Sequence, residues 1–339
     1  MTVKAMPARP VVAVAGATGA VGVEMLKVLE QRGFPASQVR ALASSRSAGK
    51  RVPFAGGDIV VEEMTEASFE GVDIALFSAG ADVSRRFRDA VVGAGAVMID
   101  NSSAFRMEDG VPLVVPEVNP GDAASHSGVI ANPNCSTIQM VVALQPLAAL
   151  APIRRIVVST YQAASGAGQA AMDELYEQSG DFLAARTFEP KMFAHRIAFN
   201  CIPQIDVFLD DGSTKEEWKM VVETRKIMHL PDVAVSATCV RVPVLRCHSE
   251  SINVEFTSLV TVEAARVALS QAPGIVVMDD PDTKLYPMPG LLEGTDETYV
   301  GRLRVDPGVE NGLAMWVVAD QLRKGAALNA VQIAELLLP

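Results

Sequence analysis

Residues 11–22 of this 339-residue chain read VVAVAGATGAVG, and this stretch decides the fold. Val11–Ala15 is an apolar run of strand length, and a helical pattern follows over Val21–Arg32. Glycines between a strand and a helix let the backbone turn tightly and approach a pyrophosphate, whose charge then meets the N–H groups at the helix N-terminus. The stretch therefore predicts a dinucleotide-binding turn, and a tight turn without a ligand is the alternative.

The same alternation continues through the first 135 residues. Strands are predicted at Val39–Ala43, Ile59–Glu62, Val72–Phe77 and Val97–Asp100, and a helix at Ala81–Gly93. Strands that alternate with helices form βαβ units, which place helices on both faces of a parallel sheet. The first part of the chain is therefore predicted to be an α/β domain.

The pattern changes from residue 153 onward. Arg154–Tyr161 is typical of a strand and Gln169–Ser179 of a helix, whereas the β-rich runs Val233–Val244 and Ile252–Val262 have little helix between them. Such runs favour a mixed or antiparallel sheet. Because the chain exceeds the usual size of one hydrophobic core, we expect a second domain of α+β type, followed by an amphipathic helix at Leu328–Leu338.

The formal net charge of −11 restricts the possible partners. Such a chain repels nucleic acid and anionic membranes, and no run of Lys or Arg offers a local exception. Salt screens this field within about 8 Å, so an anionic substrate needs a small cluster of Arg and Lys inside a cleft. No stretch reaches the roughly eighteen apolar residues of a transmembrane helix, and glycines interrupt the apolar stretch after Lys4 and Arg9 that resembles a signal peptide. We expect neither a membrane segment nor a signal peptide.

The loop that follows the second predicted strand distinguishes NAD from NADP. NAD sites usually place an acidic residue there, where it binds the ribose 2′-hydroxyl. Residues 43–50 read ASSRSAGK and contain no acid, whereas Arg46, Ser44 and Ser47 suit a 2′-phosphate. The loop favours NADP, and a solvated loop arginine is the alternative.

Cys135 is the candidate nucleophile. It lies in NPNCST, directly before the apolar helical run Ile138–Leu150, so its thiol lies near a helix N-terminus, where the dipole lowers a thiol pKa. Cys201, Cys239 and Cys247 lack this setting and are interpreted as structural. The four cysteines form no C-x-x-C pair, which argues against a metal site and suits a reducing cytoplasm.

The candidate acid/base is a histidine. His248 follows two arginines in RVPVLRCHSE, and an imidazole can both take and return a proton near neutrality. His126, His195 and His229 compete with it. The sequence prefers His248 only weakly, and a surface histidine is the alternative.

Several motifs together resemble one family. GATGAVG at 16–22, DNSSAFR at 100–106, PNCST at 133–137, YQAASGAG at 161–168 and RVPVLRCHSE at 241–250 closely resemble aspartate-β-semialdehyde dehydrogenase, in order and over nearly the whole chain. The resemblance implies the architecture of glyceraldehyde-3-phosphate dehydrogenase. Residues 1–134 would form a Rossmann-type NADP-binding domain, completed by a C-terminal helix at 321–339, and residues 135–320 a catalytic and dimerisation domain.

The resemblance also assigns site residues. Cys135 would be the acyl-enzyme nucleophile, His248 the acid/base, and Gln162 the residue that orients the thioester. Substrate contacts would come from Arg241 on the α-carboxylate, Glu216 on the amine, Lys219 and Arg106 on phosphate, and Asn134. Cofactor contacts would come from Gly16, Thr18, Gly19, Ala20, Val21, Ser44, Arg46, Ser47, Ser165, Gly166 and Gln321.

The implied activity is the NADPH-dependent reduction of β-aspartyl phosphate to aspartate semialdehyde through a Cys135 thioester, by a cytoplasmic homodimer in lysine, threonine, methionine and diaminopimelate biosynthesis. An N-acetylglutamyl-phosphate reductase or an acyl-CoA reductase is the alternative of the same chemistry. Glu216 argues against both, because a free amine attracts a carboxylate and an acetylated amine does not. A regulatory protein that senses NADP without chemistry would leave Cys135 unexplained.

Overall fold

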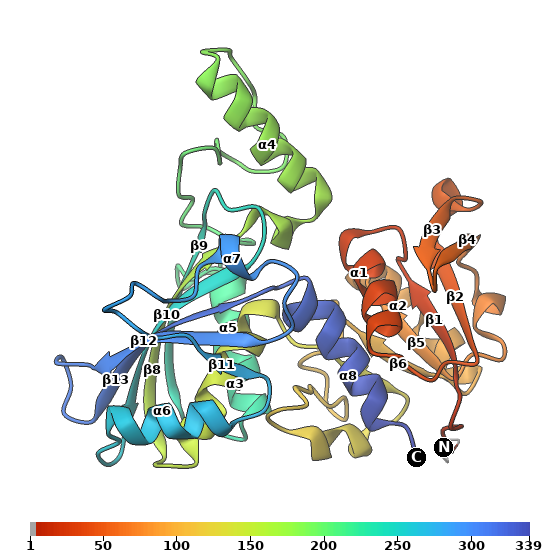
Figure 1. Cartoon of the computed structure of the whole chain (residues 1–339). Helices are drawn as coiled ribbons and strands as arrows, with labels where there is room; N and C mark the ends of the chain where they lie inside the picture. Colours follow the sequence, from red (N-terminus) through yellow and green to blue (C-terminus); the bar gives the residue numbers. More distant parts are fainter. Residues whose placement is uncertain (1–4) are drawn as a thin grey trace. The chain divides into compact units, whose positions relative to one another are not determined.

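The computed structural model describes residues 5–339, so Lys4, which bears on the question of a signal peptide, lies outside the described residues. The chain divides into two compact units (Figure 1). The first unit runs to Asn134 and includes Gly325–Pro339, and the second is Cys135–Lys324. Residues 321–324, which the resemblance assigns to the C-terminal helix, lie within the second of these units. No helix between residues 5 and 339 is long and apolar enough to cross a bilayer.

The first unit is built on a seven-stranded sheet with the order β3-β4-β2-β1-β5-β6-β7. Its strands are β1 (Val11–Ala15), β2 (Gln38–Ala43), β3 (Arg51–Phe54), β4 (Gly57–Glu63), β5 (Ile74–Phe77), β6 (Val97–Asp100) and β7 (Val129–Ala131). The predicted parallel sheet is confirmed for all neighbours except β3 and β4, which are antiparallel. A tight turn at Ala55 and Gly56, both with positive φ, joins these two strands as a hairpin at the sheet edge.

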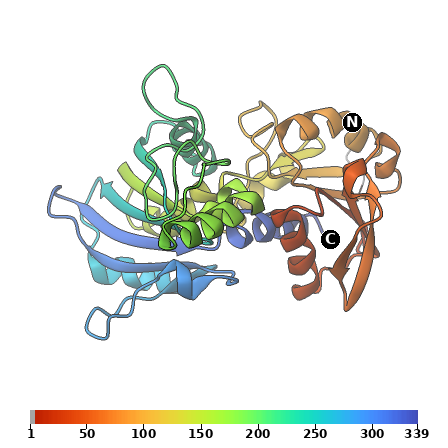
Figure 2. The same cartoon turned by 90° about the horizontal axis from the view of Figure 1, so that it is seen from above.

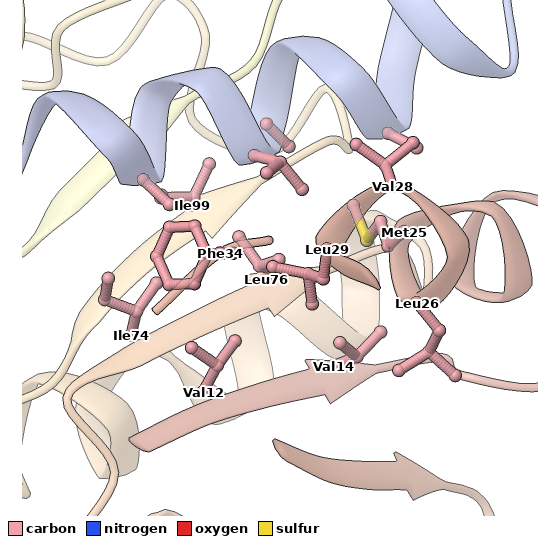
Figure 3. Close-up of a cluster of buried hydrophobic side chains, with 14 of the residues drawn as sticks. Val12, Val14, Met25, Leu26, Val28, Leu29, Phe34, Ile74, Leu76 and Ile99 are labelled. Carbon is pink, nitrogen blue, oxygen red and sulfur yellow. The ribbon is translucent and has the colours of Figure 1, made fainter. Parts of the chain in front are cut away.

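Helices cover both faces of this sheet. They are α1 (Ala20–Gln31), α2 (Ala81–Gly93) and α8 (Leu328–Leu336), with short 3-10 turns η1 (Ser45–Ser47), η2 (Glu66–Phe69) and η3 (Pro120–Ser125). Figure 3 shows Leu29 of α1 beside Leu76 of β5, under the blue α8 helix, and Val28 and Ile74 belong to the same buried cluster. The next β5 residue, Phe77, points to the opposite face and stacks on Phe69, which in turn contacts α2. Alternate β5 residues therefore fill two separate cores.

The second unit contains a six-stranded sheet with the order β11-β12-β13-β10-β8-β9. Its strands are β8 (Ile153–Gln162), β9 (Ala234–Arg241), β10 (His248–Phe256), β11 (Ile275–Val277), β12 (Thr298–Val305) and β13 (Gly312–Ala319). The β8–β9 and β11–β12 pairs are parallel and the other pairs antiparallel, which confirms the predicted mixed sheet.

Three helices pack together on one face of this sheet, namely α3 (Cys135–Ala148), α5 (Lys215–Ile227) and α6 (Val262–Gln271). Figure 1 shows α4 (Gln169–Leu183) standing away from the sheet, and Figure 2 looks down on the same helix from above. The remaining elements are η4 (Ala164–Ala167), α7 (Pro289–Leu292) and the π-helical segment η5 (Arg323–Ala327).

One predicted strand is partly wrong. The β-rich run at Ile252–Val262 begins as β10, but this strand starts earlier, at His248, and ends at Phe256. Val262 instead opens α6, because the Thr261 hydroxyl accepts a hydrogen bond from the Ala264 N–H and caps that helix.

Candidate active site

The first unit carries the glycine turn between β1 and α1. Gly16 has φ of +88°, and a Cβ there would lie 2.3 Å from the carbonyl oxygen of Ser78. A Cβ on Gly22 would lie 2.1 Å from the carbonyl oxygen of Gly16, so both positions require glycine. The strand–turn–helix junction thus includes the predicted cofactor residues Gly16, Thr18, Gly19, Ala20 and Val21.

The loop after β2 lies beside this turn, because β1 and β2 are neighbours in the sheet. The Thr18 hydroxyl donates to the Ser47 hydroxyl over 3.4 Å, and the side chains of Ser44 and Arg46 are exposed. The loop offers hydroxyls and a cation with no acidic residue over 44–50. These groups fit a dinucleotide with a 2′-phosphate, and the tight turn fits its pyrophosphate.

Arg106 is held inside the first unit by backbone carbonyls. Its Nε donates to the carbonyl oxygen of Asn132 over 3.0 Å, and its Nη2 to that of Asn101 over 2.8 Å. Asp100 anchors the same segment through hydrogen bonds of 2.6 Å from the hydroxyls of Ser84 and Ser102. Burial raises the pKa of Asp100 despite these bonds and the nearby Arg106 charge.

In the second unit, the ends of three neighbouring strands bring together three predicted residues. Gln162 is the last residue of β8, and the parallel pairing sets it opposite Arg241, the last residue of β9. His248 is the first residue of β10, whose antiparallel pairing with β8 places Ser249 opposite Tyr161. The sheet register therefore places Gln162, Arg241 and His248 at one edge although they are far apart in sequence.

His248 is fully buried and has a defined tautomer. The backbone N–H of Ala163 donates to its Nδ1 over 3.0 Å, so the proton of the neutral ring lies on Nε2. Within the described residues, Nε2 has no hydrogen-bond partner. Burial, together with the charge of Arg241, lowers the pKa of His248 well below its usual value. The ring is therefore neutral and can donate the Nε2 proton to a ligand.

Arg241 and His248 both approach the backbone of Gly166. The Arg241 Nη1 donates to the carbonyl oxygen of Ala163 over 2.6 Å. A Cβ on Gly166 would lie 2.8 Å from this Nη1 and 3.1 Å from His248 Nε2. Burial lowers the pKa of Arg241, and the negative charges of Cys135 and Glu216 partly offset this lowering.

Cys135 is the first residue of α3, as predicted, and is half-buried. All four cysteines are free. Burial raises the pKa of the Cys239 and Cys247 thiols, which suits inert structural residues, and Cys201 is exposed. The helix N-terminus distinguishes Cys135 from the other three, because its N–H groups favour a thiolate.

The first turn of α5 adds the charged residues of the site. The Thr214 hydroxyl accepts from the Glu217 N–H while the Glu217 carboxylate accepts from the Thr214 N–H, and this capping box starts the helix. Glu216 then points toward Gln162, whose Nε2 donates to Glu216 Oε1 over 3.3 Å. The Lys219 Nζ donates to Glu216 Oε2 over 3.1 Å.

Gln321 is buried in the second unit with both ends of its amide engaged. Its Oε1 accepts from the Cys247 N–H over 2.8 Å, and its Nε2 donates to the Ser165 hydroxyl. Its assignment as a cofactor contact stays a prediction. The hydrogen bonds show that Gln321 holds the Ser165 segment and the residue before His248.

The structure therefore groups the predicted residues by unit. The first unit holds Arg106, Asn134 and the residues of the glycine turn and of the 44–47 loop, and the second holds Cys135, Gln162, Ser165, Gly166, Glu216, Lys219, Arg241, His248 and Gln321. Sequence reasoning missed Asp206, whose carboxylate binds Lys219, and the Ala163 backbone that orients His248. Both contacts join segments distant in sequence and have no local pattern. No group of His, Cys, Asp and Glu in residues 5–339 is arranged to hold a metal ion.

Family models match both halves of the chain. Residues 11–126 match the NAD binding domain of semialdehyde dehydrogenases, and residues 144–324 match the semialdehyde dehydrogenase dimerisation domain. The aspartate-semialdehyde dehydrogenase of Aquifex aeolicus is 54% identical over 331 residues, which cover 96% of this chain and 97% of that protein. The chain belongs to the aspartate-semialdehyde dehydrogenase family.

Other members support this assignment. The aspartate-semialdehyde dehydrogenase of Bacillus subtilis is 52% identical over 96% of both chains. The structure of aspartate semialdehyde dehydrogenase II from Vibrio cholerae, solved in complex with ASA, has a TM-score of 0.95 and 48% identity, and covers 97% of this chain and 98% of that one. The predicted family, fold class and oxidoreductase activity are confirmed, and the N-acetylglutamyl-phosphate reductase alternative is not favoured.

The family has a nicotinamide-binding domain, which matches the glycine turn of the first unit. A structure from Candida albicans was solved with NADP, has a TM-score of 0.75 and is 29% identical over 97% of this chain and 98% of that one.

Proposed function

We propose that the protein catalyses the NADPH-dependent reduction of β-aspartyl phosphate to aspartate semialdehyde and phosphate, and the reverse reaction. The observation that carries this proposal is the convergence of Gln162, Arg241 and His248 at one end of neighbouring strands, with Glu216 hydrogen-bonded to Gln162 and Cys135 at the start of α3. We propose that the aspartate semialdehyde formed serves as a precursor in the synthesis of lysine, threonine, methionine and diaminopimelate.

The side chains take distinct parts in the proposed reaction. The Cys135 thiolate attacks the acyl carbon and phosphate leaves, which gives a thioester. NADPH, when bound, supplies the hydride. The neutral ring of His248, the proposed acid/base, then donates its Nε2–H hydrogen bond to the oxygen that gains charge on hydride transfer, and that oxygen re-forms the carbonyl as the Cys135 thiolate leaves. Gln162 fixes Glu216, which faces the substrate amine, while Arg241 binds the α-carboxylate as a planar fork.

Further residues are proposed to contact phosphate and the cofactor. Lys219 and Arg106 are proposed to bind the phosphate group, with Asn134 beside the nucleophile in sequence. For the cofactor we propose NADP, supported by the acid-free loop at Ser44, Arg46 and Ser47. Ser165, Gly166 and Gln321 complete the proposed cofactor contacts on the catalytic side.

We also propose a homodimer in the cytoplasm. The match to a dimerisation domain over residues 144–324 supports self-association. On the sheet face opposite α3, the rings of Tyr161 and Trp316 lie 5.2 Å apart, and Tyr161 is exposed. Aromatic side chains of this kind are enriched at interfaces. Sedimentation of the purified protein measures the oligomeric state directly.

Turnover tests the proposed function. The purified protein should reduce NADP with aspartate semialdehyde only when phosphate is present, and should be inactive with N-acetylglutamate semialdehyde. Cys135→Ser should retain its fold and NADP binding but lose nearly all turnover, because a serine hydroxyl has no appreciable alkoxide at neutral pH. A rate within about tenfold of the wild type, a loss of only about 1.4 kcal/mol, would rule out the thioester mechanism.

A further inference from the structure

Lys219 binds the carboxylates of Asp206 and Glu216, and Asp206 has no role in the proposed mechanism. Its Nζ donates to Asp206 Oδ2 over 2.8 Å and to Glu216 Oε2 over 3.1 Å. Glu216 lies one helical turn before Lys219 on α5, whereas Asp206 comes from the loop before that helix. The shorter contact is therefore the one to the residue outside the helix.

The backbone holds Asp206 in this place at some cost. Asp206 has φ of +68°, a left-handed conformation that Asp and Asn tolerate better than most residues. Its Oδ1 accepts from the Val207 N–H over 2.9 Å, which leaves Oδ2 for Lys219. The Lys215 N–H donates to the Val207 carbonyl oxygen over 2.8 Å and fastens the loop to the start of α5. The backbone conformation of Asp206, the Val207 N–H bond to its Oδ1 and the Lys215–Val207 bond together orient the Asp206 carboxylate toward Lys219.

The charges around Glu216 decide which ligand the site favours. Arg241, Lys219 and Lys215 contribute three positive charges, and Glu216, Asp206 and the Cys135 thiolate contribute three negative charges. Glu217 lies next in sequence, but its carboxylate is occupied by the N–H groups of Thr214 and Cys239. The six charges sum to zero, which matches an amino-acid head group that carries one ammonium and one carboxylate.

Without Asp206 this balance fails. Lys219 would then neutralise Glu216 alone, and the set with Arg241 would keep one net positive charge. Such a site would favour a carboxylate without an ammonium. Burial alone would lower the pKa of Lys219, but Glu216 and Asp206 together raise it, so the lysine remains charged and competes for Glu216 at neutral pH.

We propose that Asp206 is a specificity-determining residue: by sharing Lys219 it leaves the Glu216 carboxylate the net negative charge that selects a substrate with a free α-amine. The inference rests on the proposed function, because it assigns the substrate amine to Glu216. Asp206 touches Lys219 and not the reacting atoms, so it acts as a positioning residue through that contact.

The test compares Asp206→Asn with the wild type in the NADP-reducing direction at saturating phosphate. Two ligands are used: aspartate semialdehyde, and succinate semialdehyde, which has hydrogen in place of the amine. We expect the KM for aspartate semialdehyde to rise about fivefold, the factor equivalent to about 1 kcal/mol for a partly exposed ion pair. The inhibition constant of succinate semialdehyde should stay the same or fall.

Two controls separate charge from structure. Asp211→Asn removes a carboxylate from the same loop, but the Asp211 carboxylate is exposed and accepts from the Ser213 N–H and hydroxyl, so neither constant should change. Asparagine tolerates the backbone of Asp206; should Asp206→Asn fail to fold, Asp206→Gly accepts the same φ and removes the same charge.

The outcomes are distinct. A selective weakening of the amine-bearing ligand supports the proposal. Equal weakening of both ligands would show a merely structural role, and no change in either would show that Asp206 does not set the charge; both results overturn it. A wild type without phosphate-dependent turnover of aspartate semialdehyde would instead refute the proposed function, and that measurement precedes the variants.

Discussion

Gly166, in the η4 segment, lies against two side chains of the proposed active site, Arg241 and His248. A Cβ built there lies 2.8 Å from Arg241 Nη1 and 3.1 Å from His248 Cε1 and Nε2. Ordinary contacts between such atoms are about 3.5–4.0 Å, so Gly166→Ala forces the imidazole or the guanidinium to move by about 0.5–1 Å. The backbone at residue 166 is not left-handed, so alanine causes no strain of its own.

The displacement should reduce turnover more than stability. The Ala163 N–H fixes His248 through Nδ1, so a shifted ring loses either this bond or its alignment with the substrate. A misplacement near 1 Å can cost about 10²-fold in rate, and we expect kcat to fall about 10- to 100-fold. Steady-state kinetics in the NADP-reducing direction measure this loss, and thermal unfolding should show nearly the wild-type midpoint.

Gly180→Ala is the matched control for this variant. Gly180 lies within α4, and a Cβ there meets no atom within 4 Å. Alanine should therefore leave turnover unchanged and stabilise the helix by up to about 1 kcal/mol. A Gly166→Ala enzyme with kcat within about twofold of the wild type would refute the reasoning. A loss confined to NADP affinity would place the added methyl group against the cofactor instead of His248.

Two further predictions concern the cofactor and the buried charges. Arg46→Ala should weaken NADP binding by about 1.5–3 kcal/mol and NAD binding far less, since only NADP carries the 2′-phosphate; equal losses in titrations with both would exclude Arg46 as the discriminator. Burial raises the pKa of Glu250 well above its usual value, which Gln139 only partly offsets, so the folded state keeps this carboxyl neutral while the unfolded state ionises it. Stability is then lost as pH rises above the unfolded pKa. Glu250→Gln should therefore raise the free energy of unfolding over that of the wild type by an amount that grows by up to about 1.4 kcal/mol per pH unit, measured by denaturant unfolding; a gain that is constant from pH 5 to 8 would contradict this.

The sequence predicted the first unit well because its signals are local. β1 and β6 have the predicted bounds, and α2 spans Ala81–Gly93 as predicted, since each is a short apolar or amphipathic run bounded by glycine or polar residues. The β3 strand was missed because it has only four residues and contains Pro53, which demotes a run to an edge strand.

The second unit was harder to predict from the sequence, because its helix α5 carries few apolar residues. Thr214 and Glu217 form a capping box, which is a sequence signal that could have located the start of this helix. No such signal exists for the pairing of Gln162 with Arg241, because register across a parallel pair is set by the whole sheet. Motifs could therefore nominate the candidate site residues, but they could not predict how these residues are arranged in space.

The charge on the site is also less positive than the sequence suggested. We expected a cluster of Arg and Lys to offset the net charge of −11, and the structure does provide Lys219 and Arg241 in the second unit. Lys219 is already paired with Glu216 and Asp206, however, and Arg241 donates to a backbone carbonyl. Little net field remains to attract an anion beyond the Debye length of about 8 Å. Under the proposed function, selection therefore occurs at contact, where the fork of Arg241 and the two carboxylates that share Lys219 would distinguish an amino acid from a simple carboxylate.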